Sequence, residues 1–222
     1  MVVRGRGGRG ALWLVGLWAL MAGSVSRAQP PGPVPAQAEG AAELRGRLER
    51  LVQQTKTASW VQVRWERKGS EEQWVRSRCL WTAEGLLRMD VEDGYGAGTT
   101  LLREGNRVTI KPPGILGAFK LHKNVSDGIL RSLRGKDLRT AGFLPELQKV
   151  LERWDEVDLQ IRGTDALLRY ADTDRLQGQM AIQLETLTPL SIETRENGEV
   201  VERTTFDQVR FGVPVDPDRM AP

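Results

Sequence analysis

Few residues of this chain could carry acid–base or nucleophilic chemistry. Among its 222 residues are one histidine, His122, and one cysteine, Cys79. A Ser-His-Asp or Cys-His arrangement would need His122, and no G-x-S-x-G nucleophile motif occurs anywhere in the chain. One cysteine and one histidine are too few for a zinc site of the usual Cys/His type. We therefore interpret His122 as a surface or structural residue and expect no catalytic residue, metal or cofactor.

A carboxylate cluster and the single thiol are the other groups of the chain that could react or bind a metal. Asp90, Glu92 and Asp93 could act as acid and base or hold a calcium ion, but a solvated hairpin end is the favoured interpretation. A carboxylate-based hydrolase using Asp90 and Glu92 remains the least favoured alternative. Cys79 lies in an apolar, strand-like run, which predicts a buried, unreactive thiol. The glycine-rich stretch 94–98 carries no lysine and lies between strands, so it is not a phosphate loop.

The first 28 residues predict export. Three arginines precede an apolar run over residues 11–22, and small residues end the segment at Ser26 and Ala28. This order is typical of a secretory signal peptide, cleaved after Ala28 or, alternatively, after Ser24. The apolar run is shorter than the roughly 20 residues that a spanning helix needs, so an uncleaved anchor is less favoured. No cysteine lies directly after the run, at the expected cleavage site, so we expect an unlipidated periplasmic protein.

The formal net charge of +3 changes sign when this segment is removed. Four of the 32 basic residues (Arg4, Arg6, Arg9 and Arg27) lie in it, which leaves 28 basic residues against 29 acidic ones. A nearly neutral mature chain does not predict nucleic-acid binding. With one cysteine it has no internal disulfide, so its stability must come from packing.

Two helices are expected in one domain of residues 42–214. Residues 29–41 are rich in proline and alanine and predict a flexible linker, and residues 215–222 predict an irregular tail. Residues 42–55 and 142–154 carry apolar side chains at helical spacing. Residues 126–128 resemble a further helix start before Ile129, Leu130 and Leu133.

Between these helices the apolar residues alternate with period two, which predicts strands. Val61, Val63 and Trp65 alternate with polar residues and are expected to face inward, whereas Trp60 and Trp74 have the opposite parity. Hairpin signals lie at residues 104–106 and at Asn197-Gly198. The fold class is α+β: a curved antiparallel sheet, or half-barrel, of about ten strands, covered on its concave side by two or three helices.

Three short motifs within this predicted order of helices and strands resemble a known family. They are WTAEGLLRMD (81–90), LTPLSIE (187–193) and ENGEVVERTTF (196–206). They resemble the Lol-type superfamily of periplasmic outer-membrane lipoprotein carriers, over roughly residues 42–214. Residues 95–143, which contain Gly114-Ile-Leu-Gly117 and Asp127-Gly128, look closer to an uncharacterised bacterial branch of it. The resemblance implies a half-barrel that binds without catalysis.

Alternation and resemblance together predict an exported carrier or binder of a lipid or lipoprotein acyl chain in an apolar concavity. The expected lining is Val61, Val63, Trp65, Val75, Trp81, Leu87, Met89, Ile182, Leu190 and Ile192. The expected lid residues are Leu44, Leu48, Leu51, Phe143 and Leu147. Arg88 is either a surface arginine or a gate.

The alternative function is an envelope protein–protein interaction or sensor module with a packed concavity. For the carrier, the expected partners are lipid or lipoprotein acyl chains, with an envelope membrane protein as donor or acceptor. We expect a monomer.

Overall fold

The computed structural model describes residues 35–114, 119–173 and 175–216. The expected signal peptide and the end of the tail lie outside these residues. The elements in chain order are α1 (Pro35–Gln54), β1 (Thr57–Lys68), β2 (Glu71–Thr82), β3 (Leu86–Gly94), β4 (Thr100–Glu104), β5 (Arg107–Lys111), β6 (Leu121–Asn124), η2 (Gly128–Leu130), η3 (Leu138–Thr140), α2 (Leu144–Glu152), η4 (Trp154–Glu156), β7 (Asp158–Arg162), β8 (Asp165–Ala171), β9 (Leu176–Gln183), β10 (Pro189–Glu196) and β11 (Glu199–Phe211).

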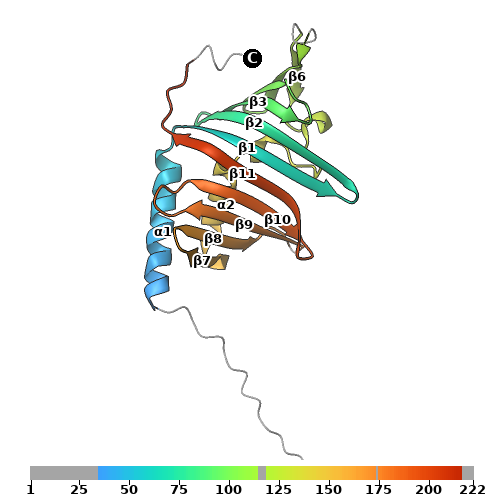
Figure 1. The fold of residues 1–222 in the computed structure, drawn as a ribbon. Helices are drawn as coiled ribbons and strands as arrows, with labels where there is room; N and C mark the ends of the chain where they lie inside the picture. Colours follow the sequence, from blue (N-terminus) through green and yellow to red (C-terminus); the bar gives the residue numbers. More distant parts are fainter. Residues whose placement is uncertain (1–34, 115–118, 174, 217–222) are drawn as a thin grey trace, which may run out of the picture. The chain divides into compact units, whose positions relative to one another are not determined.

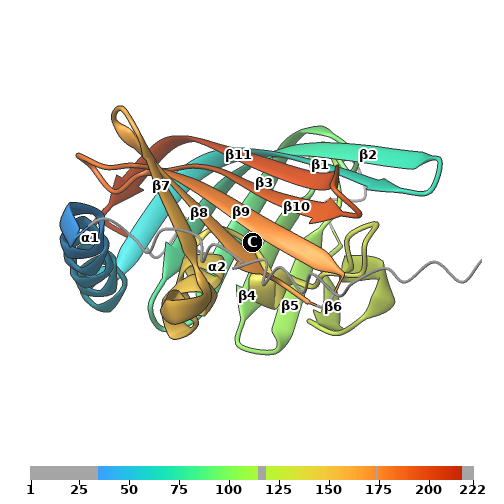
Figure 2. The same ribbon diagram turned by 90° about the horizontal axis from the view of Figure 1, so that it is seen from below.

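All eleven described strands belong to one open antiparallel sheet (Figure 1). Its order is β6-β5-β4-β3-β2-β1-β11-β10-β9-β8-β7, so the first and last parts of the chain meet where β1 pairs with β11. The sheet bends around α2, which lies on its concave side, while α1 runs along one end of the strands (Figure 2). The antiparallel sheet with helices predicted from the sequence is confirmed, with two α-helices.

The tight turns explain why neighbouring strands pair in this order. Asn197 and Gly198 have φ of 53° and 84°, the left-handed conformation that a two-residue hairpin requires, and the expected hairpin at this dipeptide is confirmed. The expected hairpin at residues 104–106 is also confirmed, by β4 and β5.

Two helical predictions need correction. Helix α1 begins at Pro35, so residues 35–41 are helical and not part of a linker. The physical reason is composition: proline is accommodated at the first helical position, and the following PAQAEGAA sequence is rich in strong helix formers.

The helix expected after residue 128 is only the single turn η2. The Asp127 side chain caps it by accepting a hydrogen bond from the Ile129 N–H, but Arg131 returns to extended backbone. The Leu133 N–H then donates to the Glu66 carboxylate at 2.9 Å and makes no helical bond. A tertiary partner therefore replaces the continuation of the helix.

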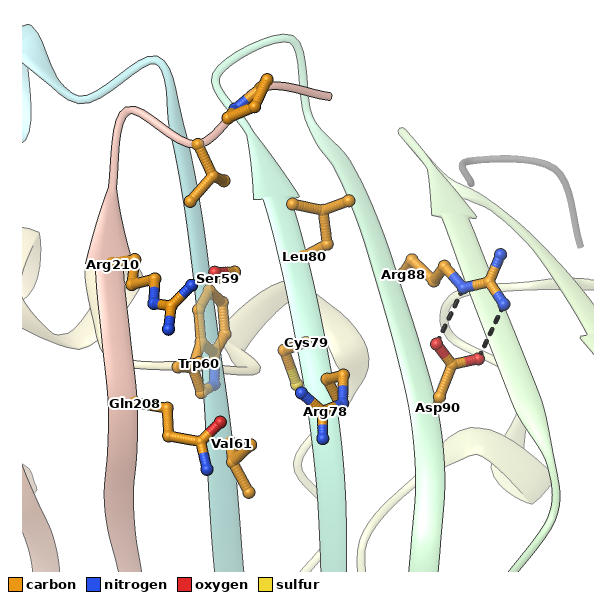
Figure 3. A pocket seen from close by; sticks show the side chains of 12 residues that line it. Ser59, Trp60, Val61, Arg78, Cys79, Leu80, Arg88, Asp90, Gln208 and Arg210 are labelled. Atoms are coloured by element: carbon orange, nitrogen blue, oxygen red, sulfur yellow. Dashed lines mark hydrogen bonds and ion pairs between the residues drawn. The ribbon is translucent and has the colours of Figure 1, made fainter. Parts of the chain in front are cut away.

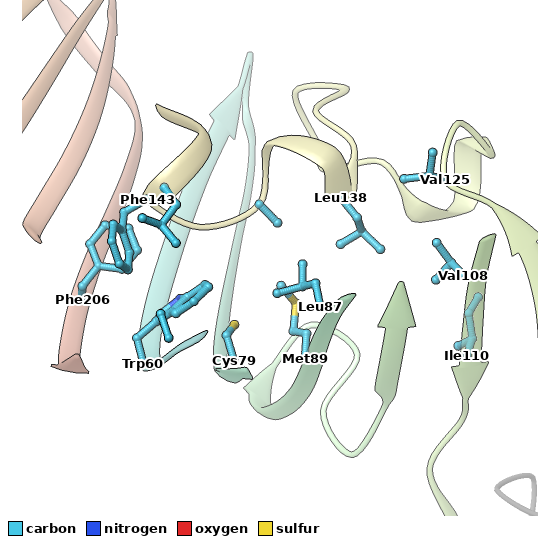
Figure 4. Close-up of a cluster of buried hydrophobic side chains, with 13 residues drawn as sticks. Trp60, Cys79, Leu87, Met89, Val108, Ile110, Val125, Leu138, Phe143 and Phe206 are labelled. Carbon is cyan, nitrogen blue, oxygen red and sulfur yellow. The ribbon is translucent and has the colours of Figure 1, made fainter. Parts of the chain in front are cut away.

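Two buried apolar clusters hold the helices and turns on the sheet. The cluster under the first strands contains Ala58, Trp60, Cys79, Leu87, Met89, Val108, Ile110, Val125, Leu138, Ala141, Phe143, Leu144 and Phe206 (Figure 4). The cluster under the last strands contains Leu44, Leu48, Leu147, Val150, Leu151, Ala166, Leu168, Tyr170, Met180 and Ile182. Ile192 packs against both clusters, at the middle of the sheet.

Candidate ligand-binding site

A pocket of about 360 Å³ lies on the concave side of the first strands. Its volume falls within the range of roughly 300–1,000 Å³ that is typical of ligand sites. Its apolar lining comes from strands β2 to β6, from the β3–β4 turn and from residues 129–138, and includes Val75, Met89, Val91, Tyr95, Leu101, Ile110, Leu121, Ile129, Leu130 and Leu138. The site is therefore an apolar trough roofed by the segment between β6 and α2.

Strand register places these walls. Val75 pairs with Gly94, and Cys79 pairs with Met89, so alternate residues of β2 and β3 face the same side. Leu101 pairs with Met89 on one side and with Ile110 on the other, which continues the apolar face across β4 and β5. The period-two pattern of these strands thus produces one continuous apolar wall.

One end of the pocket is polar and belongs to β1. Gln62, Arg64 and Glu66 line it, and the Glu66 carboxylate is nearly fully buried. Arg64 pairs with Glu66, and its Nε lies 3.3 Å from Oε1 of Glu202, a buried residue of β11. Lys136 Nζ is 2.7 Å from the other oxygen of Glu202. Two buried carboxylates are therefore matched by two cations and by the Leu133 N–H, as buried charges must be.

These ionic contacts also hold the roof over the pocket. We call residues 126–138 the roof segment. Besides Leu133 and Lys136, Arg134 bridges to the sheet through the Arg67 carbonyl and the Glu196 carboxylate, both at 3.0 Å. The roof segment has little regular structure, so its position depends on these contacts and on buried Leu138.

An aromatic group lies on the concave side where β1 and β11 pair, between the first and the last strands. The Phe143 ring packs edge-on against the rings of Trp60, Phe206 and Phe211, with centroids 5.3, 5.6 and 5.9 Å away. Phe143 is fully buried, and Figure 4 shows it between Trp60 and Phe206. The residue expected to be part of a lid is therefore a packed core residue.

Most of the expected lining lies on the concave side. Val75 and Met89 line the pocket. Trp81 and Leu87 belong to or pack against the first cluster, Ile182 belongs to the second, and Ile192 contacts both. Leu190 lies at an irregularity in the β9–β10 pairing, outside the described members of both clusters.

The face predicted for β1 is wrong. Trp60 pairs with Cys79, so Trp60 faces the concave side, while Val61, Val63 and Trp65 face the opposite side. The prediction followed the apolar residues of β1. It failed because the concave residues of this strand are mostly polar and serve the buried ion pairs described above.

The other expected lid residues lie under the last strands and not over the pocket. Leu44, Leu48 and Leu147 are buried in the second cluster, and Leu51 is partly buried against it. They cover the last strands, whereas the pocket is covered by the roof segment. Sequence reasoning missed this segment, although Ile129, Leu130 and Leu133 were the apolar signal that marked it.

Arg88 faces the convex side, where a second hollow of about 760 Å³ is lined by several arginines (Figure 3). Its guanidinium donates two hydrogen bonds to Asp90, at 2.8 and 3.0 Å. A gate for the concave pocket is therefore wrong for Arg88, because the sheet separates it from that pocket.

Asp90 and Glu92 form ion pairs with arginines on this convex face. Partial burial raises the pKa of Asp90, but hydrogen bonds from Arg88 and Thr100 outweigh it and hold the pKa below its ordinary value. Slight desolvation likewise raises the pKa of Glu92. The ion pairs with Arg76 and Arg78, at 3.2 and 2.9 Å, outweigh it and hold the pKa below its ordinary value. Both groups stay ionised at neutral pH, as structural partners of arginines. The described residues contain no cluster of three or more metal-ligating side chains.

Cys79 and His122 match their expected environments. Burial raises the pKa of the Cys79 thiol to about 12, so it stays protonated and unreactive. His122 is exposed on β6, with Nδ1 3.2 Å from the Thr109 hydroxyl.

Comparisons with known proteins find similar solved structures at low sequence identity. No family model and no curated protein matches the chain. A solved structure of an uncharacterized conserved protein from Thermus thermophilus is similar at 9% identity, covering 84% of this chain and 93% of that one, with a TM-score of 0.49. A LolA superfamily protein from Nitrosomonas europaea is similar at 9% identity, covering 81% and 96%, with a TM-score of 0.39.

The MucA/MucB complex of Pseudomonas aeruginosa is also among the similar structures. Its identity is 16%, its TM-score 0.45, and the match covers 82% of this chain. The chain spans 61% of the length of the protein that it matches there.

Proposed function

We propose that this chain is a non-enzymatic periplasmic carrier or binder that holds an acyl chain of a lipid or lipoprotein in the concave pocket. The observation that carries the proposal is the pocket itself, whose walls are apolar on five strands, β2 to β6, and polar at one end. Apolar walls with a few polar groups are typical of sites for small apolar ligands. No helix within the described residues has the length and apolar character needed to cross a membrane.

A matched pair of valines tests the proposal. Val75 lines the pocket, and Val63 has similar partial exposure on the other face of the sheet. Val75→Trp fills the pocket and should weaken binding of a fluorescent fatty acid at least tenfold, whereas Val63→Trp should leave it unchanged. Thermal unfolding of both variants checks that they remain folded.

The proposal fails if the exported protein yields no lipid on extraction with organic solvent and binds no fluorescent fatty acid. It also fails if both tryptophan variants bind like the unmodified protein.

The alternative is an envelope protein–protein interaction module. The packed second cluster favours it, because Leu48, Leu168 and Met180 are wholly buried and fill the concavity under the last strands. The absence of acyl binding, together with capture of a defined envelope protein, would support this alternative.

A further inference from the structure

The rim of the pocket is unusually apolar for a solvated edge. Six large apolar side chains of the described residues are exposed by 45% or more, and three of these line this pocket. They are Tyr95, Ile129 and Leu121, exposed by 72%, 70% and 45%. They come from the β3–β4 turn, from η2 and from β6, so three separate elements bring them to one rim.

Basic residues accompany this rim. Lys111 precedes Pro112, which lines the pocket, and Lys120 precedes Leu121. Both lysines are exposed, as is Arg131, which itself lines the pocket.

The charge of this part of the sequence is one-sided. Residues 95–131 contain six basic and two acidic residues, and one of the acids, Asp127, lies 3.5 Å from Lys123. The chain without its first 28 residues has one acidic residue more than basic ones. Of these six basic residues, Arg131 lines the pocket, and Lys111 and Lys120 adjoin residues that line it, so three positive charges lie at the mouth of the pocket.

We propose that this rim docks the protein on the surface of an anionic lipid bilayer. Exposed apolar side chains insert into the boundary between headgroups and acyl chains, and neighbouring lysines and arginines are attracted to anionic headgroups. The rim offers both kinds of contact at the opening of an apolar pocket. Docking would place that opening against lipid without any span through the membrane. The evidence for this surface is its exposed apolar and basic side chains, so it does not depend on the acyl-binding proposal.

Vesicle flotation tests the proposal. The exported protein is mixed with vesicles of phosphatidylcholine containing about one-third phosphatidylglycerol, and separately with vesicles of phosphatidylcholine alone. We expect at least tenfold tighter binding to the anionic vesicles, decreasing as salt is added. Equal binding to the two vesicles, or none to either, would overturn the proposal and leave a protein partner as the occupant of the rim.

Two pairs of substitutions divide the rim into its parts. Tyr95→Ser with Ile129→Ser removes apolar contact, and Lys111→Glu with Lys120→Glu reverses charge; each pair should weaken binding to anionic vesicles at least fivefold. The control is Ile161→Ser with Arg162→Glu on β7, at the other edge of the sheet, where Ile161 is 51% exposed. A loss in the control as large as that in the rim variants contradicts the proposal.

The two proposals are separable by experiment. Lys111 and Lys120 are not among the residues lining the pocket, so their variant should bind a fluorescent fatty acid normally in the absence of vesicles. Normal probe binding with lost flotation supports the docking surface. Flotation without any probe binding supports docking and removes the acyl-binding proposal alone.

Discussion

The Phe143 ring contacts three other aromatic rings from β1 and β11 and is fully buried. Phe143→Ala should lower the free energy of unfolding by about 3–5 kcal/mol, because it removes a large buried side chain and leaves a cavity. Urea denaturation measures the change. Phe119→Ala is the control, since that ring is 67% exposed and its loss should matter by less than about 0.5 kcal/mol. A loss in Phe143→Ala no larger than in the control would show that the aromatic group contributes little.

Asp90 gives the protein a pH-dependent contribution to stability. In the folded protein the pKa of Asp90 lies below its ordinary value of 3.8. Partial burial raises this pKa, but the hydrogen bonds from Arg88 and Thr100 have the larger effect and lower it. The contribution is complete above the ordinary value and is lost as the pH falls through the lower folded value. Asp90→Asn should therefore destabilise the protein most near pH 7, and the difference from the unmodified protein should shrink below about pH 4.

Urea denaturation of both proteins between pH 7 and pH 3 measures this difference. Glu84→Gln, at an exposed turn residue, is the control for removal of a carboxylate. A difference for Asp90→Asn that stays constant down to pH 3 would contradict the assigned role.

At the scale of elements, the entry into α2 depends on Gly142. It has a φ of +89°, and a Cβ there would lie 2.6 Å from the Trp60 ring. Gly142→Ala should destabilise the protein by roughly 2–5 kcal/mol, since left-handed backbone costs about 1–2 kcal/mol and overpacking about 1–3 kcal/mol. Gly40→Ala in α1, with no atom within 4 Å of the new Cβ, should be neutral or slightly stabilising. Thermal unfolding compares the two, and equal effects would argue against the close packing at Trp60.

The strands and hairpins were predictable because their signals are local. Alternation over β2 and β3 and the dipeptide Asn197-Gly198 need no distant partner to form the observed structure. The face of β1 was not predictable in this way. Its concave residues are the half-buried Arg64 and the buried Glu66, which lie there because Glu202 and Leu133, distant in the sequence, satisfy their charges.

The candidate site, like the fold, was predictable only where its residues follow from local alternation. Val75 and Met89 follow from alternation, and the structure places both in the pocket. The roof segment was not identified, because its position comes from tertiary bonds such as that between Arg134 and Glu196. Apolar periodicity indicates which residues are buried, whereas ion pairs between distant segments decide which face of a strand they occupy.

Across the whole molecule, the two halves of the sheet differ in how they are closed. The last strands are closed by apolar packing of α1 and α2, with Leu48, Leu168 and Met180 fully buried. The first strands are closed by the roof segment, which is held largely by polar contacts to Glu66, Glu202 and Glu196. Segments with few buried apolar contacts open at lower free energy than packed cores.

Hydrogen exchange should therefore be slow in β8 and β9 and fast in residues 126–136. An acyl ligand in the pocket contacts the roof and the walls beneath it, so a fatty acid should slow exchange in residues 95–138 and leave β8 and β9 unchanged. Exchange measured by mass spectrometry with and without palmitate tests this. Slowing spread evenly over the sheet would indicate global stabilisation. Slowing confined to β8 and β9 would place the ligand under α1 and α2, and so contradict the assignment of the site to the first half of the sheet.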